Sequence, residues 1–174
     1  MPRQFRTVRE LIYWEYAKLI AGSAVNDRKA YSFVNFTYRR LVSEHLTPTD
    51  IVTENKALFS EGDTCAYCGN TSNLHWEHII PRSKGGPESF DNLVRACESC
   101  NLSKAARDPY QWYAGEHIDN IPRVVLGKLL KLAFSAYSAV GVIDSEPYMA
   151  EHKVQRVSLC QIFKQSPGQS SNAA

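Results

Sequence analysis

Helical periodicity of apolar residues marks three stretches of the chain, Arg6–Ile20, Ala30–Glu44 and Ile121–Val140. Their apolar positions recur at spacings of three and four residues, so each stretch is predicted to be a helix with one buried face. Gly141 follows the third stretch, where glycine favours a helix end. A shorter helical segment is expected to run from Thr47 toward Leu58.

The centre of the chain has a different pattern. Leu74–Ile80 alternates partly between apolar and polar residues, which predicts a short strand. Ser83–Pro87 is predicted to be a turn, and Phe90–Ala96 a second strand or an irregular return. From Asn101 a helix is expected, with an interruption at Asp108-Pro109. The predicted fold class is therefore α+β, with a strand–turn–strand–helix unit embedded in mainly helical N- and C-terminal flanks.

Four regions are predicted along the chain: a helical flank at 1–60, the central unit at 61–115, a second helical flank at 116–163 that packs on the rest, and a disordered tail at 164–174. No apolar run is long enough to span a bilayer. Met1–Ala24 is amphipathic and charged, unlike a secretory signal. A cytoplasmic protein that does not act at a membrane is therefore expected.

Four of the five cysteines form two Cys-x-x-Cys pairs, Cys65/Cys68 and Cys97/Cys100. Two such pairs can present four thiolates to one point, the tetrahedral arrangement that zinc favours. Two disulfides or a redox pair are the alternatives, but paired cysteines without a secretory signal are more often metal ligands. A structural zinc site is therefore expected, and the lone Cys160 is interpreted as a buried thiol.

The two cysteine pairs are separated by the 28 residues 69–96, more than the roughly 15–20 of a simple zinc ribbon. The additional length contains Glu77-His78, Gly85-Gly86 and Asn92-Leu93. A structural knuckle would not need these polar residues, so the spacing predicts more than a structural module.

The segment from Cys65 to Lys104 resembles the HNH endonucleases, whose core is the ββα-metal, or His-Me, finger. The family string combines Cys-x-x-Cys, acid-His-Ile-x-Pro, Gly-Gly, Asn-Leu and Cys-x-x-Cys-Asn-x-x-Lys. It is matched here by Cys65/Cys68, Glu77-His78-Ile79-Ile80-Pro81, Gly85-Gly86, Asn92-Leu93, Cys97/Cys100-Asn101 and Lys104. The last histidine of the family name is Asn101 in this chain, and Glu77 stands where aspartate is also frequent.

The resemblance implies a role for each of these residues. His78 would be the general base that takes a proton from the attacking water. Glu77 and Asn101 would hold one catalytic divalent cation, Mg²⁺ or Mn²⁺, although Asn101 could also cap the following helix. Asn92 would hold the loop so that His78 points correctly. The residues expected to contact nucleic-acid phosphates are Arg82, Lys84 and Lys104.

These residues predict a metal-dependent endonuclease that hydrolyses DNA phosphodiester bonds, with double-stranded DNA as the expected partner. By resemblance the products carry 5′-phosphate and 3′-hydroxyl ends. The charge of the chain gives little further evidence for a nucleic-acid partner. The net formal charge is +2, and residues 62–110 carry five Lys/Arg against six Asp/Glu. Cutting both strands with one site per chain would require a homodimer.

Two alternatives remain open from the sequence. A non-catalytic zinc module that binds nucleic acid or a partner protein explains the cysteines but leaves Glu77-His78 and Asn101 without a role. A structure-selective nuclease for RNA or branched DNA shares the site and differs only in substrate. Activity that requires added Mg²⁺ or Mn²⁺ would distinguish a nuclease from a binding module.

Overall fold

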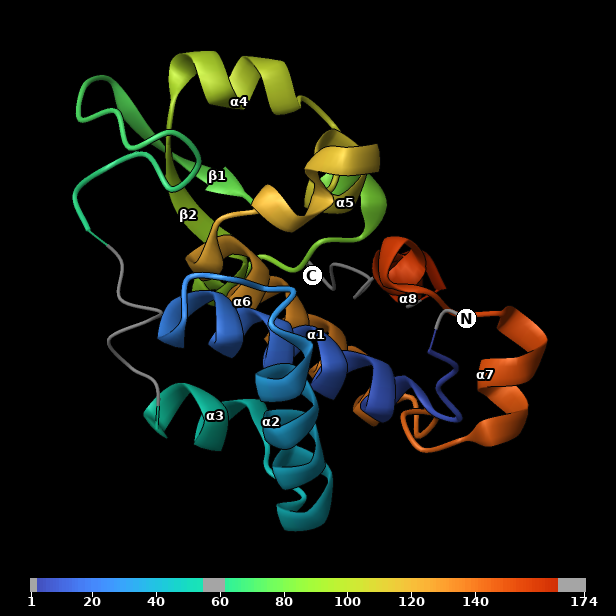
Figure 1. Cartoon of the computed structure of the whole chain (residues 1–174). Helices are drawn as coiled ribbons and strands as arrows, with labels where there is room; N and C mark the ends of the chain where they lie inside the picture. Colours follow the sequence, from blue (N-terminus) through green and yellow to red (C-terminus); the bar gives the residue numbers. More distant parts are fainter. Residues whose placement is uncertain (1–2, 55–61, 166–174) are drawn as a thin grey trace.

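The structure, a computed structural model, describes residues 3–54 and 62–165. The described chain is mostly helical and contains one two-stranded antiparallel sheet (Figure 1). This architecture confirms the predicted α+β fold class with helical flanks. The disordered tail was predicted at 164–174, but Lys164 and Gln165 belong to helix α8 (Ile162–Gln165). The rest of that segment, 166–174, and the end of the third helical segment at Leu58 lie outside the described residues.

Helix α1 (Val8–Ala24) lies at the centre of the helical part, where α2 (Tyr31–Glu44) and α6 (Arg123–Ala139) both pack against it (Figure 1). Because two helices cover α1, its buried residues lie on most of its sides, which explains the broad apolar pattern in the sequence. The backbone N–H of Glu10 donates to the Thr7 hydroxyl and fixes the start of the helix.

The remaining helices complete this layer. α3 (Pro48–Glu54) contacts α6. α6 ends just before Gly141, the residue predicted to end it, and closes with a Schellman turn. In this turn the Gly141 N–H donates to the Ser138 carbonyl and the Val142 N–H to the Tyr137 carbonyl. Gly141 has a φ of +78°, which suits glycine at this position.

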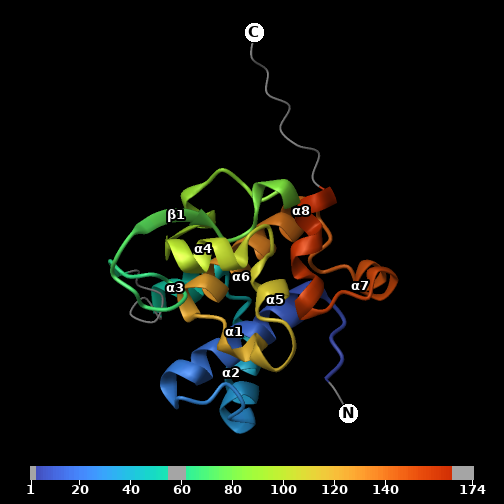
Figure 2. The same cartoon turned by 90° about the horizontal axis from the view of Figure 1, so that it is seen from above.

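Three elements after α6 were not predicted from the sequence: α7 (Glu146–His152), the 3₁₀ segment η5 (Arg156–Gln161) and α8 (Ile162–Gln165). α8 packs against α6, and η5 packs against α1. Figure 2 shows α7 at the edge of the molecule opposite β1. Within the described residues no helix is both long and apolar enough to cross a membrane.

The sheet consists of β1 (Leu74–His78) and β2 (Leu93–Cys97), with Leu74 opposite Cys97 and His78 opposite Leu93. β2 begins three residues later than predicted, because Phe90–Asn92 forms the 3₁₀ turn η3. The turn between the strands contains a second 3₁₀ segment, η2 (Arg82–Lys84).

Helix α4 (Glu98–Lys104) follows β2 directly and packs against both strands. Because α4 begins before Asn101, this residue lies inside the helix and does not cap it. The predicted break at Asp108-Pro109 is present: α5 (Pro109–Trp112) starts there with the Asp108 carboxylate accepting the Gln111 N–H. The 3₁₀ segment η4 (Gly115–Asn120) then leads to α6.

One hydrophobic core joins the helical layer to the hairpin. Ile79, Ile80 and Val94 are fully buried and belong to the same cluster as the apolar residues of α1 and α6. A second, smaller cluster surrounds Cys65, Ala96 and Cys97. The end of β1 is therefore held rigidly, since its two following residues are part of the main core.

Candidate nuclease site

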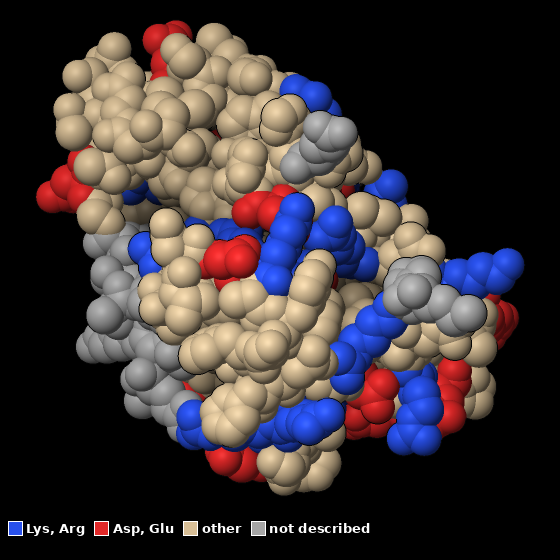
Figure 3. All heavy atoms as spheres, in the orientation of Figure 1, with Lys and Arg blue, Asp and Glu red and all other residues tan. Residues whose placement is uncertain are grey.

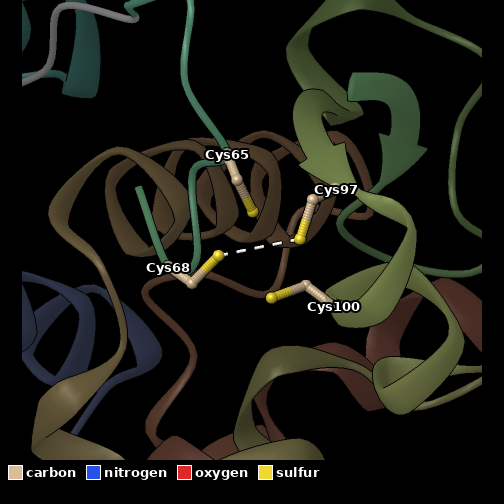
Figure 4. Close-up of side chains that lie close together, drawn as sticks. All are labelled: Cys65, Cys68, Cys97 and Cys100. Carbon is tan, nitrogen blue, oxygen red and sulfur yellow. Dashed lines mark hydrogen bonds between the residues drawn. The ribbon is translucent and has the colours of Figure 1, made fainter. Parts of the chain in front are cut away.

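The four predicted zinc ligands come together where the segment before β1 meets the junction of β2 and α4. Their sulfur atoms all lie within 4.8 Å of one another, and Cys68 Sγ is 3.6 Å from Cys97 Sγ. Figure 4 shows the four sulfurs pointing toward one another. Four thiolates bound to one zinc at about 2.3 Å lie roughly 3.8 Å apart, so the cluster fits a tetrahedral ion. All four are free thiols, in contrast to the disulfide alternative.

The backbone around Cys65 favours its thiolate form. Burial raises the pKa of Cys65, but hydrogen bonds from the backbone N–H groups of Cys97, Cys68 and Tyr67 outweigh this effect and lower the pKa to about 7. Gly69, at a φ of +77°, donates its N–H to the Cys65 carbonyl and closes the turn between the first two ligands. Since thiolates bind metal, these backbone hydrogen bonds favour Cys65 as a metal ligand.

Glu77 lies on the inner side of β1 and is 6% exposed. Its carboxylate accepts two hydrogen bonds: Lys104 Nζ lies 2.5 Å from Oε1, and the Tyr67 hydroxyl donates to Oε2 over 2.7 Å. Lys104 also donates to the backbone carbonyl of His78 over 2.9 Å. Burial lowers the pKa of Lys104, and the Glu77 charge opposes this by raising it. These contacts tie α4 to the end of β1.

The Lys104 side chain is fully buried, a placement that does not match the predicted phosphate contact. Its ammonium group has no exposed surface, so its charge acts on Glu77 instead. The sequence contains no signal for this pairing, because it depends on how α4 packs on β1.

Glu77 and Asn101 fit a divalent cation by the chemistry of their donors. Both oxygens of the Glu77 carboxylate already accept hydrogen bonds, from Lys104 and from Tyr67. Asn101 lies one turn before Lys104 on α4 and is partly exposed. Carboxylate and amide oxygens are the ligands that Mg²⁺ and Mn²⁺ prefer.

His78 is the last residue of β1, and its side chain is 24% exposed. Its Nε2 lies 3.3 Å from Oε2 of Glu88, and Arg82 Nη2 donates to the same oxygen over 2.8 Å. The Arg82 hydrogen bond holds the pKa of Glu88 below its usual range, so Glu88 remains ionised near neutral pH. A carboxylate at Nε2 favours the tautomer with the proton on Nε2, in which Nδ1 is the proton acceptor.

Asn92 is fully buried and fastens the loop between the strands. Its Oδ1 accepts the Ile80 N–H over 2.9 Å, while its Nδ2 donates to the carbonyls of Ile80 and Pro87 over 2.9 and 3.0 Å. These are the backbone hydrogen bonds that its predicted loop-holding role requires. They fix the chain two residues after His78.

Glycine is required at two neighbouring positions of this loop, Gly85 and Gly86, for different steric reasons. A Cβ atom at Gly86 would overlap the carbonyl oxygen of Ile80, so only glycine fits beside the Asn92 hydrogen bonds. Gly85 has a φ of +81°, and a Cβ atom there would overlap the carbonyl oxygen of Phe163 in α8. The loop that follows His78 is therefore in close contact with the C-terminal helix.

The other two predicted phosphate contacts differ in exposure. The Arg82 side chain is 68% exposed and pairs with Glu88. Lys84 is 18% exposed and turns toward α5, where its Nζ contacts Gln111 Oε1 and lies 3.8 Å from Asp108 Oδ2. Figure 3 shows few charged side chains over the upper part of the molecule, around α4 and the hairpin, and more over the helical layer.

Two side chains at the site were missed from the sequence. Tyr67 lies between the first two cysteines, and nothing in the sequence predicts that its hydroxyl reaches Glu77. Glu88 lies in the loop ten residues after His78, and no sequence pattern connects it to the histidine. Both contacts depend on the folded path of the loop.

Comparison with known proteins places the site in a family. The family model of the HNH endonuclease matches residues 65–107. The CRISPR-associated endonuclease Cas9 of Corynebacterium diphtheriae is 36% identical over 61 residues, which are 33% of this chain and 6% of that protein. Cas9 of Actinomyces naeslundii is 44% identical over 55 residues, 28% of this chain and 5% of that protein. No solved structure matches the chain.

The chain spans only a small part of the length of these curated relatives. The family match starts at the first ligand cysteine, Cys65, and ends after Lys104, so it includes both cysteine pairs and Glu77-His78. Residues 65–107 of this chain are therefore an HNH endonuclease domain, with four cysteines arranged as in its zinc-stapled type.

Proposed function

We propose that this chain is a metal-dependent endonuclease that hydrolyses DNA phosphodiester bonds, with zinc in the four-cysteine cluster. The observation that carries the proposal is the junction of β1 and α4, where Lys104 ties the Glu77-His78 pair to the helix that contains Asn101. The two relatives are named endonucleases, which supports a nucleic-acid substrate.

His78 is the general base in this proposal. Its partly exposed ring is accessible to a water molecule, and the interaction of Nε2 with Glu88 leaves Nδ1 to take the proton from that water. Asn92 and the buried Ile79 and Ile80 hold the backbone that follows His78, so the ring keeps its orientation.

Glu77 and Asn101 would hold the catalytic Mg²⁺ or Mn²⁺. When bound, such an ion supplies positive charge that stabilises the phosphoryl group and the leaving oxygen. Tyr67 and Lys104 orient the Glu77 carboxylate through their hydrogen bonds. The exposed Arg82 is placed to contact the substrate backbone near His78.

We propose a structural role for the zinc cluster and the flanks. The cluster joins the segment before β1 to the β2–α4 junction, so it fixes α4 relative to His78. In this division, regions 1–60 and 116–163 form the platform that carries the unit at 61–115.

Plasmid cleavage tests the proposal. Purified protein is incubated with supercoiled plasmid in the presence of Mg²⁺, of Mn²⁺ or of a chelator. The His78→Ala variant is assayed in parallel. His75→Ala is the control, because His75 is an exposed histidine on the same strand. We expect nicking or linearisation that needs added metal, is lost in His78→Ala and persists in His75→Ala. Normal cutting by His78→Ala would refute the base assignment.

A folded, zinc-loaded protein that cuts neither plasmid nor single-stranded DNA under any metal would favour the non-catalytic binding module. Cutting of the single strand alone would indicate a nuclease whose substrate is not duplex DNA. The ratio of nicked to linear product also tests strand choice. Efficient linearisation together with a dimer in sedimentation would support the homodimer, whereas nicking by a monomer would contradict it.

A further inference from the structure

Two large aromatic side chains lie exposed next to each other on the hairpin. Trp76 of β1 is 48% exposed and Phe90 of η3 is 63% exposed. Their ring centroids are 5.3 Å apart with an interplanar angle of 63°. Burying one such ring contributes strongly to binding, and exposed aromatic pairs therefore mark interaction surfaces.

Each of the two rings has a cation beside it. The Arg95 guanidinium lies 5.1 Å from the Trp76 ring, and Lys128 Nζ lies 4.9 Å from the Phe90 ring. The Lys128 side chain extends from α6 to β2, where its Nζ donates to the Leu93 carbonyl over 2.7 Å. The Trp76–Phe90 surface, meaning Trp76, Phe90, Arg95 and Lys128, thus combines open aromatic rings with positive charge.

Two acidic side chains of the neighbouring loop have cationic partners outside this surface. Asp91 pairs with Lys131 over 3.0 Å, and Glu88 pairs with Arg82. The Nε atom of Arg95 is buried and has no hydrogen-bond partner among the described residues. Arg95 is therefore held over Trp76 by packing and not by an acid.

The surface shares a side of the sheet with the proposed base. In the antiparallel register Trp76 is opposite Arg95 and His78 is opposite Leu93. Because side chains alternate along a strand, Trp76 and His78 project to the same side, while Glu77 projects to the other. Two strand residues span about 7 Å, so a ligand on Trp76 has its neighbouring backbone within reach of His78.

We propose that the Trp76–Phe90 surface stacks an unpaired base of the substrate strand next to the cleavage site. This inference rests on the proposed nuclease function and narrows the substrate to single-stranded or locally unpaired nucleic acid. A base inside a duplex has both faces covered by its neighbours, whereas an unpaired base offers a face to an aromatic ring. Arg95 and Lys128 supply the positive charge that the adjacent phosphates require.

Binding measurements test this surface separately from cleavage. All proteins carry His78→Ala, and no Mg²⁺ or Mn²⁺ is added, so the substrate stays intact. Fluorescence anisotropy measures the Kd for a labelled single-stranded oligonucleotide and for the same sequence as a duplex. Trp76→Ala and Phe90→Ala are compared with Phe36→Ala, which removes an aromatic residue that is 71% exposed on α2, far from the hairpin in sequence. Circular dichroism and zinc content confirm that each variant is folded.

We expect the parent to bind the single strand more tightly than the duplex. Trp76→Ala and Phe90→Ala should each raise the single-strand Kd by about 5- to 100-fold, the range for loss of one base–aromatic stack. Trp76→Phe should restore most of the binding, and Phe36→Ala should leave the Kd unchanged.

Equal binding by Trp76→Ala, Phe90→Ala and the parent would overturn the proposal, as would equal or tighter binding of the duplex. A loss of self-association without any change in the Kd would assign the surface to a second copy of this chain. None of these outcomes affects the cleavage assay on plasmid and single-stranded DNA, in which the wild-type protein and His78→Ala decide whether the chain is a nuclease.

Discussion

Lys104 and Glu77 form a buried ion pair between α4 and β1, with Nζ 2.5 Å from Oε1 and side-chain exposures of 0% and 6%. Lys104 thus joins Glu77, a residue proposed to bind the catalytic cation, to the backbone carbonyl of His78, the proposed base. A charge removed from water in this way needs its partner, because the desolvation cost remains when the partner is lost. Lys104 therefore stabilises the site even though it is not accessible to substrate.

Replacing Lys104 with Met leaves Glu77 buried without a counter-charge. We expect the free energy of unfolding to fall by about 3–5 kcal/mol in urea titrations. Glu44→Ala is the matched control, because it breaks an ion pair with Arg40 in which the Arg40 and Glu44 side chains are 47% and 45% exposed, and it should cost less than about 1 kcal/mol. Similar losses in the two variants would show that the Lys104 pair is not buried in solution.

Replacing Asn92 with Ala leaves the Ile80 N–H and the carbonyls of Ile80 and Pro87 without their partner. Each buried polar group left unpaired costs about 1–3 kcal/mol, so the melting temperature should fall clearly. Ser83→Ala, at an exposed position in the same loop, should leave the melting temperature within about 2 °C of the wild type. If Asn92→Ala melts like Ser83→Ala, the amide does not hold the loop.

Removing one thiolate from the cluster is expected to abolish zinc binding. For Cys97→Ala, elemental analysis should find no bound zinc in place of one ion per chain, and the melting temperature should fall by roughly 10 °C or more. Cys160→Ala serves as the control, because Cys160 is buried outside the cluster, and it should keep its zinc. Full zinc content in Cys97→Ala would exclude a four-cysteine site.

The stability of the chain should depend on pH through Asp144. Two hydrogen bonds from Arg9, 2.6 and 2.7 Å long, hold the pKa of Asp144 below its ordinary value of 3.8. A carboxylate whose pKa is lower in the folded state than in the unfolded state contributes its full stabilisation above the unfolded-state pKa. This stabilisation is lost as the pH falls through the folded-state pKa. Between about pH 5 and pH 3 the wild type should therefore lose more stability than Asp144→Asn.

Measuring the pH dependence of stability for Arg9→Gln tests whether Arg9 causes the lowered pKa of Asp144. If the Arg9 guanidinium lowers the pKa of Asp144, Arg9→Gln should flatten the acid limb of the stability curve as Asp144→Asn does. An unchanged acid limb in both variants would place the acid sensitivity at other carboxylates.

The sequence was sufficient for features that depend on short-range patterns. The two cysteine pairs, the strand ending at His78 and the periodic helix α6 all follow from local spacing. The short elements α7 and α8 were not predicted, because seven and four residues carry too little periodicity to be recognised.

The partners of the site residues could not be read from the sequence either. Lys104 appears there as a basic residue near the end of a helix, and only the packing of α4 on β1 directs it to Glu77. The contact between His78 and Glu88 depends on a loop closed by Asn92 and by the absence of a side chain at Gly86. Roles that arise from long-range packing need the folded chain.

The close approach of Gly85 to the Phe163 carbonyl restricts which proteins could accept the HNH segment, residues 65–107, as a graft. Phe163 lies outside residues 65–107, so a graft of the family segment alone would expose the underside of the loop that orients His78. Any host protein that carries such a finger must provide its own backbone against this glycine. The conformation of the loop that follows His78 therefore depends partly on residues outside the HNH segment. A protein that acquires this segment must also provide a matching surface beside Gly85.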